Sequence, residues 1–226
     1  METHKSHLKV REIVLPPIYV SGILLLYMSS FFLVNAHNIF KGIQERGGTK
    51  TYAEAERPGG PSLILVSVGT FAFFAEALML ILLGFTGDTY VFLSSLGLDT
   101  KHATLLQLIG IFSMGAGVFL FIWSVVSRGR SAVSWEMPED HALVTWGPYR
   151  YVRHPSYLGY FLMFVGLPLT WLNLIAVIPL VAIPGYMSIV EIEEEMLLHR
   201  FGEAYRRYRH DTGRFLPRIT KRNTVT

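Results

Sequence analysis

The chain has 226 residues, of which 51% are hydrophobic and only 16% are charged, and its mean hydropathy is +0.37. Soluble domains typically carry about 25% charged residues, so this composition excludes a soluble globular protein, and its apolar content excludes a disordered one. The absence of cysteine excludes disulfides, thiolate metal sites and a cysteine nucleophile. The charged residues lie in bursts between long uncharged runs, which predicts an integral membrane protein.

The uncharged runs predict the membrane spans in chain order. A run of 22 residues covers 13–34, one of 23 with a single glutamate covers 63–85, and one of 25 covers 103–127. Each is long enough for one crossing, which needs about 20 apolar residues. The fourth run, 155–190, has 36 residues and fits two short crossings broken near residues 171–173. We therefore predict an all-α integral membrane fold of five transmembrane helices, in which the last two form a helical hairpin.

The distribution of basic residues predicts the orientation of these spans. With five crossings, sixteen of the twenty Lys and Arg residues fall on one side of the membrane and four on the other. The positive-inside rule places the richer side, which holds the C-terminus and the loop before residue 155, in the cytoplasm. The basic tail and the pI near 9.1 predict contact with anionic membrane lipids. We expect no nucleic-acid partner, because no large basic surface interleaved with aromatic residues lies outside the spans.

Two features lie inside the spans. Glu76 sits near the middle of the second run, where it either faces a neighbouring helix in a protonated or hydrogen-bonded form or lines a substrate cavity. The small residues Gly110, Ser113 and Gly117 predict close packing of the third span against another helix. Histidines at 4, 7 and 102 have no partners at metal-ligand spacing, so we predict no metal site.

Two polar segments flank the predicted hairpin, at 141–159 and 191–208, so they must lie side by side at the cytoplasmic face. The first has two histidines and two arginines among tyrosines, and the second begins with four glutamates within five positions. Carboxylates suit a cationic ligand, tyrosines suit an aromatic heterocycle, and a helix start with a histidine suits an anion. S-adenosylmethionine combines all three, although nucleotide cofactors fit these residue types nearly as well.

The second segment also has an apolar periodicity. Leu197, Phe201, Tyr205 and Tyr208 recur at helical spacing. This pattern predicts a cytoplasmic amphipathic helix that lies on the membrane.

The first segment reads H-x-L-V-x-x-G-x-Y-x-x-x-R-H-P-S-Y from His141 to Tyr157. The second reads E-E-x-x-L-x-x-x-F-G-x-x-Y-x-x-Y from Glu193 to Tyr208 and is followed by Leu216-Pro217. At this spacing around a hairpin, the paired motifs resemble the isoprenylcysteine carboxyl methyltransferase family, which is grouped with the phospholipid methyltransferases among integral membrane enzymes. The resemblance covers roughly residues 141–219.

The resemblance implies an S-adenosylmethionine-dependent methyltransferase whose cofactor is held between the two segments. It implies cofactor contacts from His141, Leu143, Val144, Tyr149, His154, Pro155, Ser156, Tyr157 and Glu193. For catalysis we expect Arg153 to clamp an anion and Glu194, or alternatively Glu76, to accept a proton where an amine or thiol acceptor requires it. Residues 1–140 then form a three-span region with a cytoplasmic loop, and 141–226 form the cofactor-binding region.

The substrate side of the predicted site departs from the family. The eukaryotic enzymes carry an arginine four residues before the cofactor-binding glutamate, where it meets the substrate carboxylate, whereas this chain has Ile189. We therefore expect a lipophilic acceptor that enters from the bilayer and is less anionic, such as an amine, a thiol or a lipid headgroup. The alternative function is an NADPH-dependent membrane sterol reductase of related architecture, although the His-Pro-Ser-Tyr motif argues against it.

Overall fold

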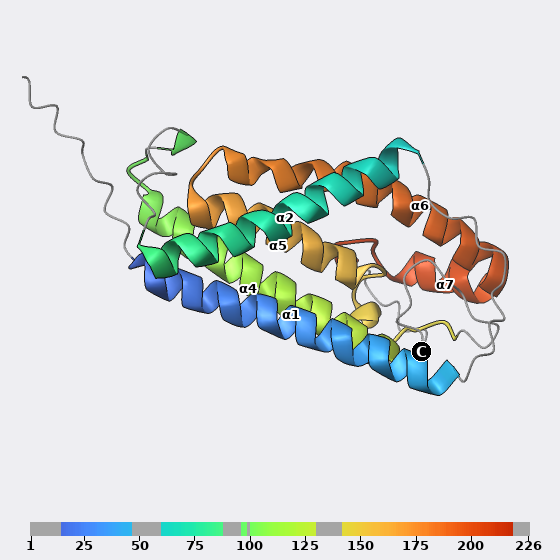
Figure 1. Cartoon of the computed structure of the whole chain (residues 1–226). Helices are drawn as coiled ribbons and strands as arrows, with labels where there is room; N and C mark the ends of the chain where they lie inside the picture. The colour runs from blue at the N-terminus through green and yellow to red at the C-terminus, as the bar shows by residue number, and fades with distance from the viewer. Residues whose placement is uncertain (1–14, 47–59, 88–95, 99, 130–141, 219–226) are drawn as a thin grey trace, which may run out of the picture.

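The computed structural model describes residues 15–46, 60–87, 96–98, 100–129 and 142–218. Within these residues the fold is a bundle of helices, with a shorter helix and the C-terminal segment gathered at one end (Figure 1). The α-helices are α1 Pro17–Arg46, α2 Pro61–Thr86, α4 Ala103–Arg128, α5 Pro155–Trp171, α6 Ala182–Phe201 and α7 Glu203–Asp211. Two 3₁₀ helices, η2 Gly147–Arg150 and η3 Ile175–Val181, precede α5 and α6.

Four helical segments of the described residues are long and apolar enough to cross a membrane: Pro17–Lys41, Pro61–Thr86, Ala103–Arg128 and Ile175–Phe201. The predicted all-helical membrane architecture is therefore confirmed at this level. The fifth predicted span corresponds to α5, which has 17 residues. At about 1.5 Å per residue it is shorter than the hydrocarbon core is thick, so the count of five crossings stays a prediction.

Prolines and glycines set the helix boundaries. Pro61 and Pro155 stand at the start of α2 and α5, where the missing backbone N–H has no intrahelical partner to lose. At the other end of α2, Gly87 adopts φ 79° and its N–H donates to the Leu83 carbonyl. Glycine adopts this left-handed conformation at low cost because it has no Cβ.

The break predicted inside the fourth apolar run is confirmed. α5 ends at Trp171, and Leu172 has the left-handed conformation with φ 53°. The chain then turns through Asn173, whose Oδ1 accepts a hydrogen bond from the Ile175 N–H at 3.0 Å, and returns through η3 into α6. The side-chain oxygen compensates a backbone donor that the turn would otherwise leave without a partner. α5 and α6 therefore form the expected helical hairpin.

Close packing of α4 on α5 confirms the prediction from the small residues. A Cβ at Gly110 would lie 2.6 Å from the Gly166 carbonyl oxygen, and one at Gly117 would lie 2.6 Å from that of Gly159. Between them, Ser113 Oγ donates to the Leu162 carbonyl at 2.8 Å. The two backbones approach each other because the residues at the crossing have almost no side chain.

α2 crosses the bundle diagonally and packs on a different helix at each end (Figure 1). Near its C-terminal end Ser21 Oγ of α1 donates to the Leu80 carbonyl at 3.1 Å. Near its N-terminal end Ser62 Oγ donates to Ser188 Oγ of α6 at 3.0 Å. α1 and α2 therefore touch at one end and diverge toward the other.

The single amphipathic helix predicted from Leu197 to Tyr208 is not what the structure has. α6 ends at Phe201, Gly202 adopts φ 52°, and α7 begins at Glu203 in a new direction. Tyr205 is completely buried. The apolar residues of the pattern lie on two different helices, Leu197 and Phe201 on α6 and Tyr205 and Tyr208 on α7. Their spacing in the sequence does not reveal that the helix ends between them at Gly202.

Candidate cofactor site

The two polar segments that flank the hairpin lie side by side, as predicted. The Tyr157 hydroxyl of the first donates to Glu193 of the second at 2.5 Å, and His154 Nε2 lies 3.2 Å from Glu194 Oε1. Pro155 starts α5 directly after His154, which is why the histidine stands at the mouth of the hairpin. Both glutamates belong to helix α6, which places them beside His154 and Tyr157.

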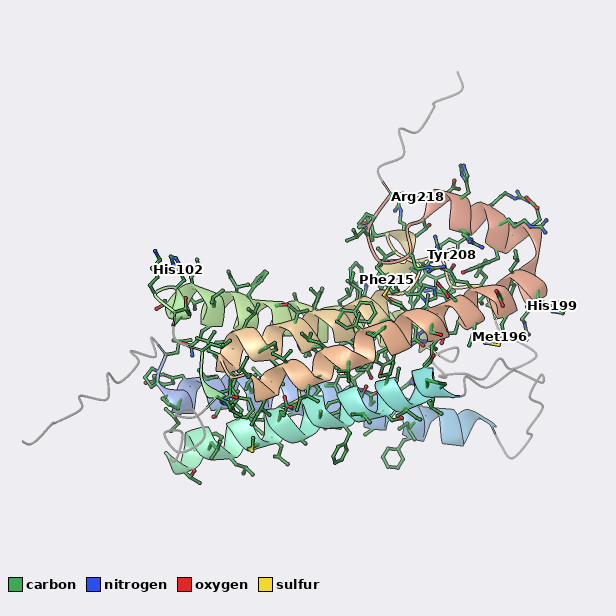
Figure 2. The ribbon with its side chains drawn as sticks, turned by 90° about the horizontal axis from the view of Figure 1, so that it is seen from above. His102, Met196, His199, Tyr208, Phe215 and Arg218 are labelled. Atoms are coloured by element: carbon green, nitrogen blue, oxygen red, sulfur yellow. The ribbon has the colours of Figure 1, made fainter. Side chains whose placement is uncertain are left out.

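The chain after α7 completes the site from a third direction. The Arg153 N–H donates to the Gly213 carbonyl at 2.8 Å, and the His154 N–H donates to the Arg214 carbonyl at 3.1 Å. These bonds hold the C-terminal segment parallel to the residues that lead into α5. Figure 2 shows the consequence: Tyr208 and Phe215 lie at the end of the molecule where α6 continues past α2, far from His102 at the opposite end.

Glu194 is the centre of this cluster and is 2% exposed. Its carboxylate accepts hydrogen bonds from Arg153 Nε at 2.9 Å and from Arg214 Nη2 at 3.0 Å, besides its contact with His154. The hydrogen bond to Glu194 raises the pKa of Arg214. Arg153 is also buried and donates to the backbone carbonyls of Thr212 and Arg209. The buried charges are thus compensated by specific partners, which is the condition for burying them.

Glu193 differs from its neighbour. Its side chain is 19% exposed and its partners are the Tyr157 hydroxyl and His154 Nδ1, the latter at 3.7 Å. No arginine lies within ion-pair distance of it among the described residues. Among the described residues no arginine pairs with the Glu193 carboxylate, whereas Glu194 pairs with Arg153 and Arg214.

The remaining residues predicted to contact the cofactor differ in their burial. Val144, Tyr149, Pro155 and Ser156 are buried and Leu143 is half-buried, whereas His141 lies outside the described residues. The Tyr149 hydroxyl is buried, and the Ser124 and Ser156 hydroxyls lie close enough to it to lower its pKa. Burial raises the pKa of this hydroxyl, and the nearby charge of Arg128 opposes that rise.

Arg153 and Glu194, which the sequence puts forward as anion clamp and proton acceptor, bind each other in the structure. Those catalytic roles stay predictions. Glu76 is also buried, and its Oε2 has no hydrogen-bond partner among the described residues. Two cations at the site, Arg128 and Arg214, were not singled out by sequence reasoning. The only signal for Arg214 is its position directly before the Phe-Leu-Pro that ends the second motif.

A continuous row of aromatic rings leads from the site toward the lipid-facing side. Tyr157 contacts Tyr186, which stacks on Tyr160 with ring centroids 5.3 Å apart. Tyr160 in turn contacts Phe31 of α1, whose ring lies 5.3 Å from Phe74 of α2. Aromatic rings in such contacts prefer edge-on or offset arrangements and form a rigid, apolar wall.

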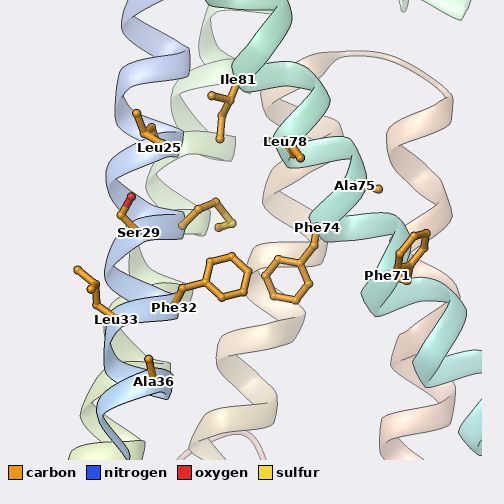
Figure 3. A pocket seen from close by; sticks show the side chains of 11 residues that line it. Leu25, Ser29, Phe32, Leu33, Ala36, Phe71, Phe74, Ala75, Leu78 and Ile81 are labelled. Carbon is orange, nitrogen blue, oxygen red and sulfur yellow. The ribbon is translucent and has the colours of Figure 1, made fainter.

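The row ends at an apolar groove of about 820 Å³ between α1 and α2. Phe32 and Phe74 meet across its floor, and Leu33, Ala36 and Phe71 line the part where the helices separate (Figure 3). Ser29 is its one polar side chain. The groove arises from the divergence of α1 and α2, and its composition suits a hydrocarbon chain.

The chain is similar to known proteins. The family model for phospholipid methyltransferase matches residues 105–204, which include most of α4 and all of α5 and α6. The predicted family resemblance is confirmed. The curated protein-S-isoprenylcysteine O-methyltransferase of Tribolium castaneum is 39% identical over 90 residues, covering 38% of this chain and 32% of that protein.

Other relatives agree with this match. The protein-S-isoprenylcysteine O-methyltransferase of Xenopus laevis is 32% identical over 126 residues, covering 54% of this chain and 44% of that protein. The chain thus matches between about a third and under half of the length of these relatives. The solved structure of the eukaryotic intramembrane Ras methyltransferase ICMT (isoprenylcysteine carboxyl methyltransferase) superposes with a TM-score of 0.51 at 24% identity. That superposition covers 92% of this chain and 70% of the other, and it shows the same fold.

Proposed function

We propose that this protein is a membrane methyltransferase that uses S-adenosylmethionine and acts on a lipophilic acceptor. The observation that carries the proposal is the Glu193 carboxylate, which Tyr157 and His154 hold at the mouth of the hairpin and which no arginine pairs with among the described residues. A sulfonium or ammonium cation is the ligand that such a carboxylate prefers. The family match over residues 105–204 supports the same function.

The residues present fit this cofactor. The Glu193 carboxylate, which no arginine pairs with among the described residues, suits the positively charged sulfonium. We assign cofactor contacts to the nine predicted residues: His141, Leu143, Val144, Tyr149, His154, Pro155, Ser156, Tyr157 and Glu193. The pair Arg153–Glu194 acts in this proposal by positioning His154, because Glu194 contacts both Arg153 and the imidazole.

When bound, S-adenosylmethionine supplies an electrophilic methyl group on a sulfonium. An ionised acceptor needs no general base, so the protein's contribution is to align the acceptor and to exclude water. The rigid aromatic wall of Tyr157, Tyr160 and Tyr186 suits both tasks. We further propose five crossings, with α5 as the short one, and a cytoplasmic site and C-terminus, as the distribution of basic residues predicts.

The groove between α1 and α2 supports a lipophilic acceptor. It opens on the surface that these helices present to lipid, and its floor continues into the aromatic row that ends at Tyr157. An acceptor chain in the groove would reach the site from the bilayer without crossing water. This path would favour amphiphilic acceptors over water-soluble ones.

Binding of the cofactor tests the proposal directly. Calorimetry of the purified full-length protein should detect S-adenosylmethionine, and Glu193→Gln should weaken it by the loss of a charge-assisted hydrogen bond, about 1.5–3 kcal/mol or roughly tenfold to over a hundredfold. The matched control is Glu195→Gln, since Glu195 is the exposed neighbour on the same helix. Absence of binding to the wild type, or equal affinities for Glu193→Gln and the wild type, would refute the assignment.

The acceptor path is tested by filling the groove. Ala75→Phe places a ring in the groove, whereas Val68→Phe places one on an exposed position of the same helix outside it. The first change should raise KM for a farnesylated acceptor severalfold and leave cofactor affinity unchanged, and the second should change neither. Equal kinetics for both variants would exclude this groove as the path.

A further inference from the structure

Three exposed aromatic residues meet on the surface where α4 ends. Trp123 of α4 is 38% exposed, and Trp146 and Tyr151, which flank η2, are 53% and 54% exposed. The rings of Trp123 and Tyr151 contact each other with centroids 6.5 Å apart. Trp146 Nε1 donates to the Ser127 carbonyl in the last turn of α4 at 3.0 Å. These three residues form an aromatic patch that joins α4 to the segment around η2.

Gly147 holds η2 directly against α4. It adopts φ 61°, and a Cβ at this position would collide with the Ser127 side chain. Glycine alone permits this backbone conformation and this close approach together. The next residues then alternate between two environments, since Tyr149 is buried and Arg150 is exposed. One side of η2 therefore belongs to the proposed site and the other to the surface of the protein.

The length of α4 places the aromatic patch at the boundary of the bilayer. α4 has 26 residues and is about 39 Å long, whereas the hydrocarbon core of a bilayer is about 30 Å thick. A centred helix of this length projects by slightly less than one turn at each end, into the headgroup region. The exposed aromatic residues deeper in α4 are Phe112 and Phe119, which have no polar atom, and the change to tryptophan occurs only at Trp123.

The composition of the patch suits phospholipid headgroups. Tryptophan and tyrosine concentrate at this level of a membrane because each combines an apolar ring with one polar group. Arg150 adds an exposed positive charge directly before Tyr151, and the phosphates of lipid headgroups are negative. The headgroup layer therefore matches the patch in both polarity and charge.

A second copy of the chain, or another protein, is the other occupant that would cover these rings. A specific protein interface buries about 800 Å² on each partner and is depleted of charged residues at its centre. The patch consists of three rings only, and Arg150 lies next to one of them. Its small extent and its charge favour lipid over protein.

We propose that Trp123, Trp146 and Tyr151, with Arg150 beside them, bind the phospholipid headgroup layer and set the depth of the site in the bilayer. The consequence for catalysis rests on the proposed function. η2 carries Tyr149, one of the residues assigned to the cofactor, so the layer that the patch contacts lies at the level of the cofactor. A lipophilic acceptor anchored in the same bilayer would then present its polar end at this level. The patch thus contributes to acceptor binding rather than to cofactor binding.

Fluorescence quenching of the full-length protein in lipid nanodiscs measures the depth of the patch. The phospholipids carry bromine either near the glycerol or near the end of the acyl chain, and Trp135, which lies outside the described residues, is replaced by phenylalanine. Bromine near the glycerol should quench the emission more strongly, and Trp123→Phe and Trp146→Phe should each remove a large share of the quenched intensity. Trp171→Phe is the control, because its ring is 3% exposed and should contribute little to quenching by either lipid.

Kinetics in the same nanodiscs test the consequence for catalysis. The double variant Trp123→Ala/Tyr151→Ala should raise KM for a farnesylated acceptor severalfold, and its affinity for S-adenosylmethionine, measured by calorimetry, should equal that of the wild type. Tyr19→Ala is the matched control, because Tyr19 is a similarly exposed tyrosine in the first turn of α1, at the opposite end of the bundle (Figure 1). This variant should match the wild type in both measurements.

Three results would overturn the inference. Equal quenching by the two lipids would place the rings in the hydrocarbon core. No quenching by either lipid would mean that protein, such as a second copy of the chain, covers the patch. An unchanged acceptor KM in the double variant would show that the patch does not set the depth for the reaction. Failure of the wild type to bind S-adenosylmethionine would instead refute the proposed function, and the expected quenching would still support the lipid contact.

Discussion

The α4–α5 interface and the interface between α6 and the C-terminal segment hold this molecule together in different ways. At the first, glycines let two backbones meet, and the polar contact between Ser113 and the Leu162 carbonyl is local. At the second, Glu194 joins Arg153 and Arg214 across 41 and 20 positions of the chain. One interface depends on the absence of side chains and the other on the presence of three charged ones.

The two interfaces differ because one lies among apolar helices and the other at the end of the bundle. Inside a bilayer the hydrophobic effect does not drive helices together, so close packing is the main attraction available. At the end of the bundle charges can be brought together, but each must find a partner because an unpaired buried ion costs several kcal/mol. We therefore expect the first interface to be sensitive to added volume and the second to lost charge.

The largest effect is expected at the charged interface. Glu194→Gln keeps the shape of the side chain but leaves Arg153 buried without a counter-ion, which should destabilise the protein by about 3–5 kcal/mol. The measurement is denaturant unfolding of the purified protein in detergent. Glu195→Gln on the exposed face is the control and should unfold like the wild type. Similar stabilities of the two variants would show that the cluster does not hold the C-terminal segment.

A smaller effect is expected where the helices touch. Gly117→Ala adds a Cβ that would lie 2.6 Å from the Gly159 carbonyl oxygen, so the backbones must separate, at a cost of about 1–3 kcal/mol. The same change at Gly22 meets nothing within 4 Å. There alanine should be neutral or stabilise the helix by up to about 1 kcal/mol. The same unfolding assay gives both values, and equal signs for the two substitutions would contradict the packing argument.

The smallest loss of stability is expected when a hydrogen bond that holds α7 is removed. Tyr208 Oη donates to the Tyr149 carbonyl at 2.7 Å, so Tyr208→Phe removes one neutral hydrogen bond and should cost about 0.5–1.5 kcal/mol. Tyr151→Phe, at an exposed tyrosine of the same face, should cost less. Thermal melting with both variants measures the difference. A larger loss for Tyr151→Phe would mean that α7 is held mainly by other contacts.

The sequence predicted the hairpin, its break and the meeting of the two motif segments because these depend on short-range information. An uncharged run of 36 residues that is too long for one crossing must turn, and its flanks must then meet. The small residues of α4 were informative for the same reason, since a helical period places them on one face. Prediction failed between Leu197 and Tyr208, where the helical period continues through Gly202 although the helix ends before it.

Chain order, hydropathy and the paired motifs were sufficient to predict an all-helical membrane protein, its family resemblance and the residues that meet at the mouth of the hairpin. Tertiary structure alone decided which charges are compensated and which remain available. Arg153, Arg214 and Arg128 look alike in sequence, yet the first two share Glu194, whereas the buried Nε of Arg128 has no hydrogen-bond partner within the described part of the chain. Partner choice among charged residues depends on distances of a few ångströms between elements far apart in the chain, and no local pattern encodes such distances.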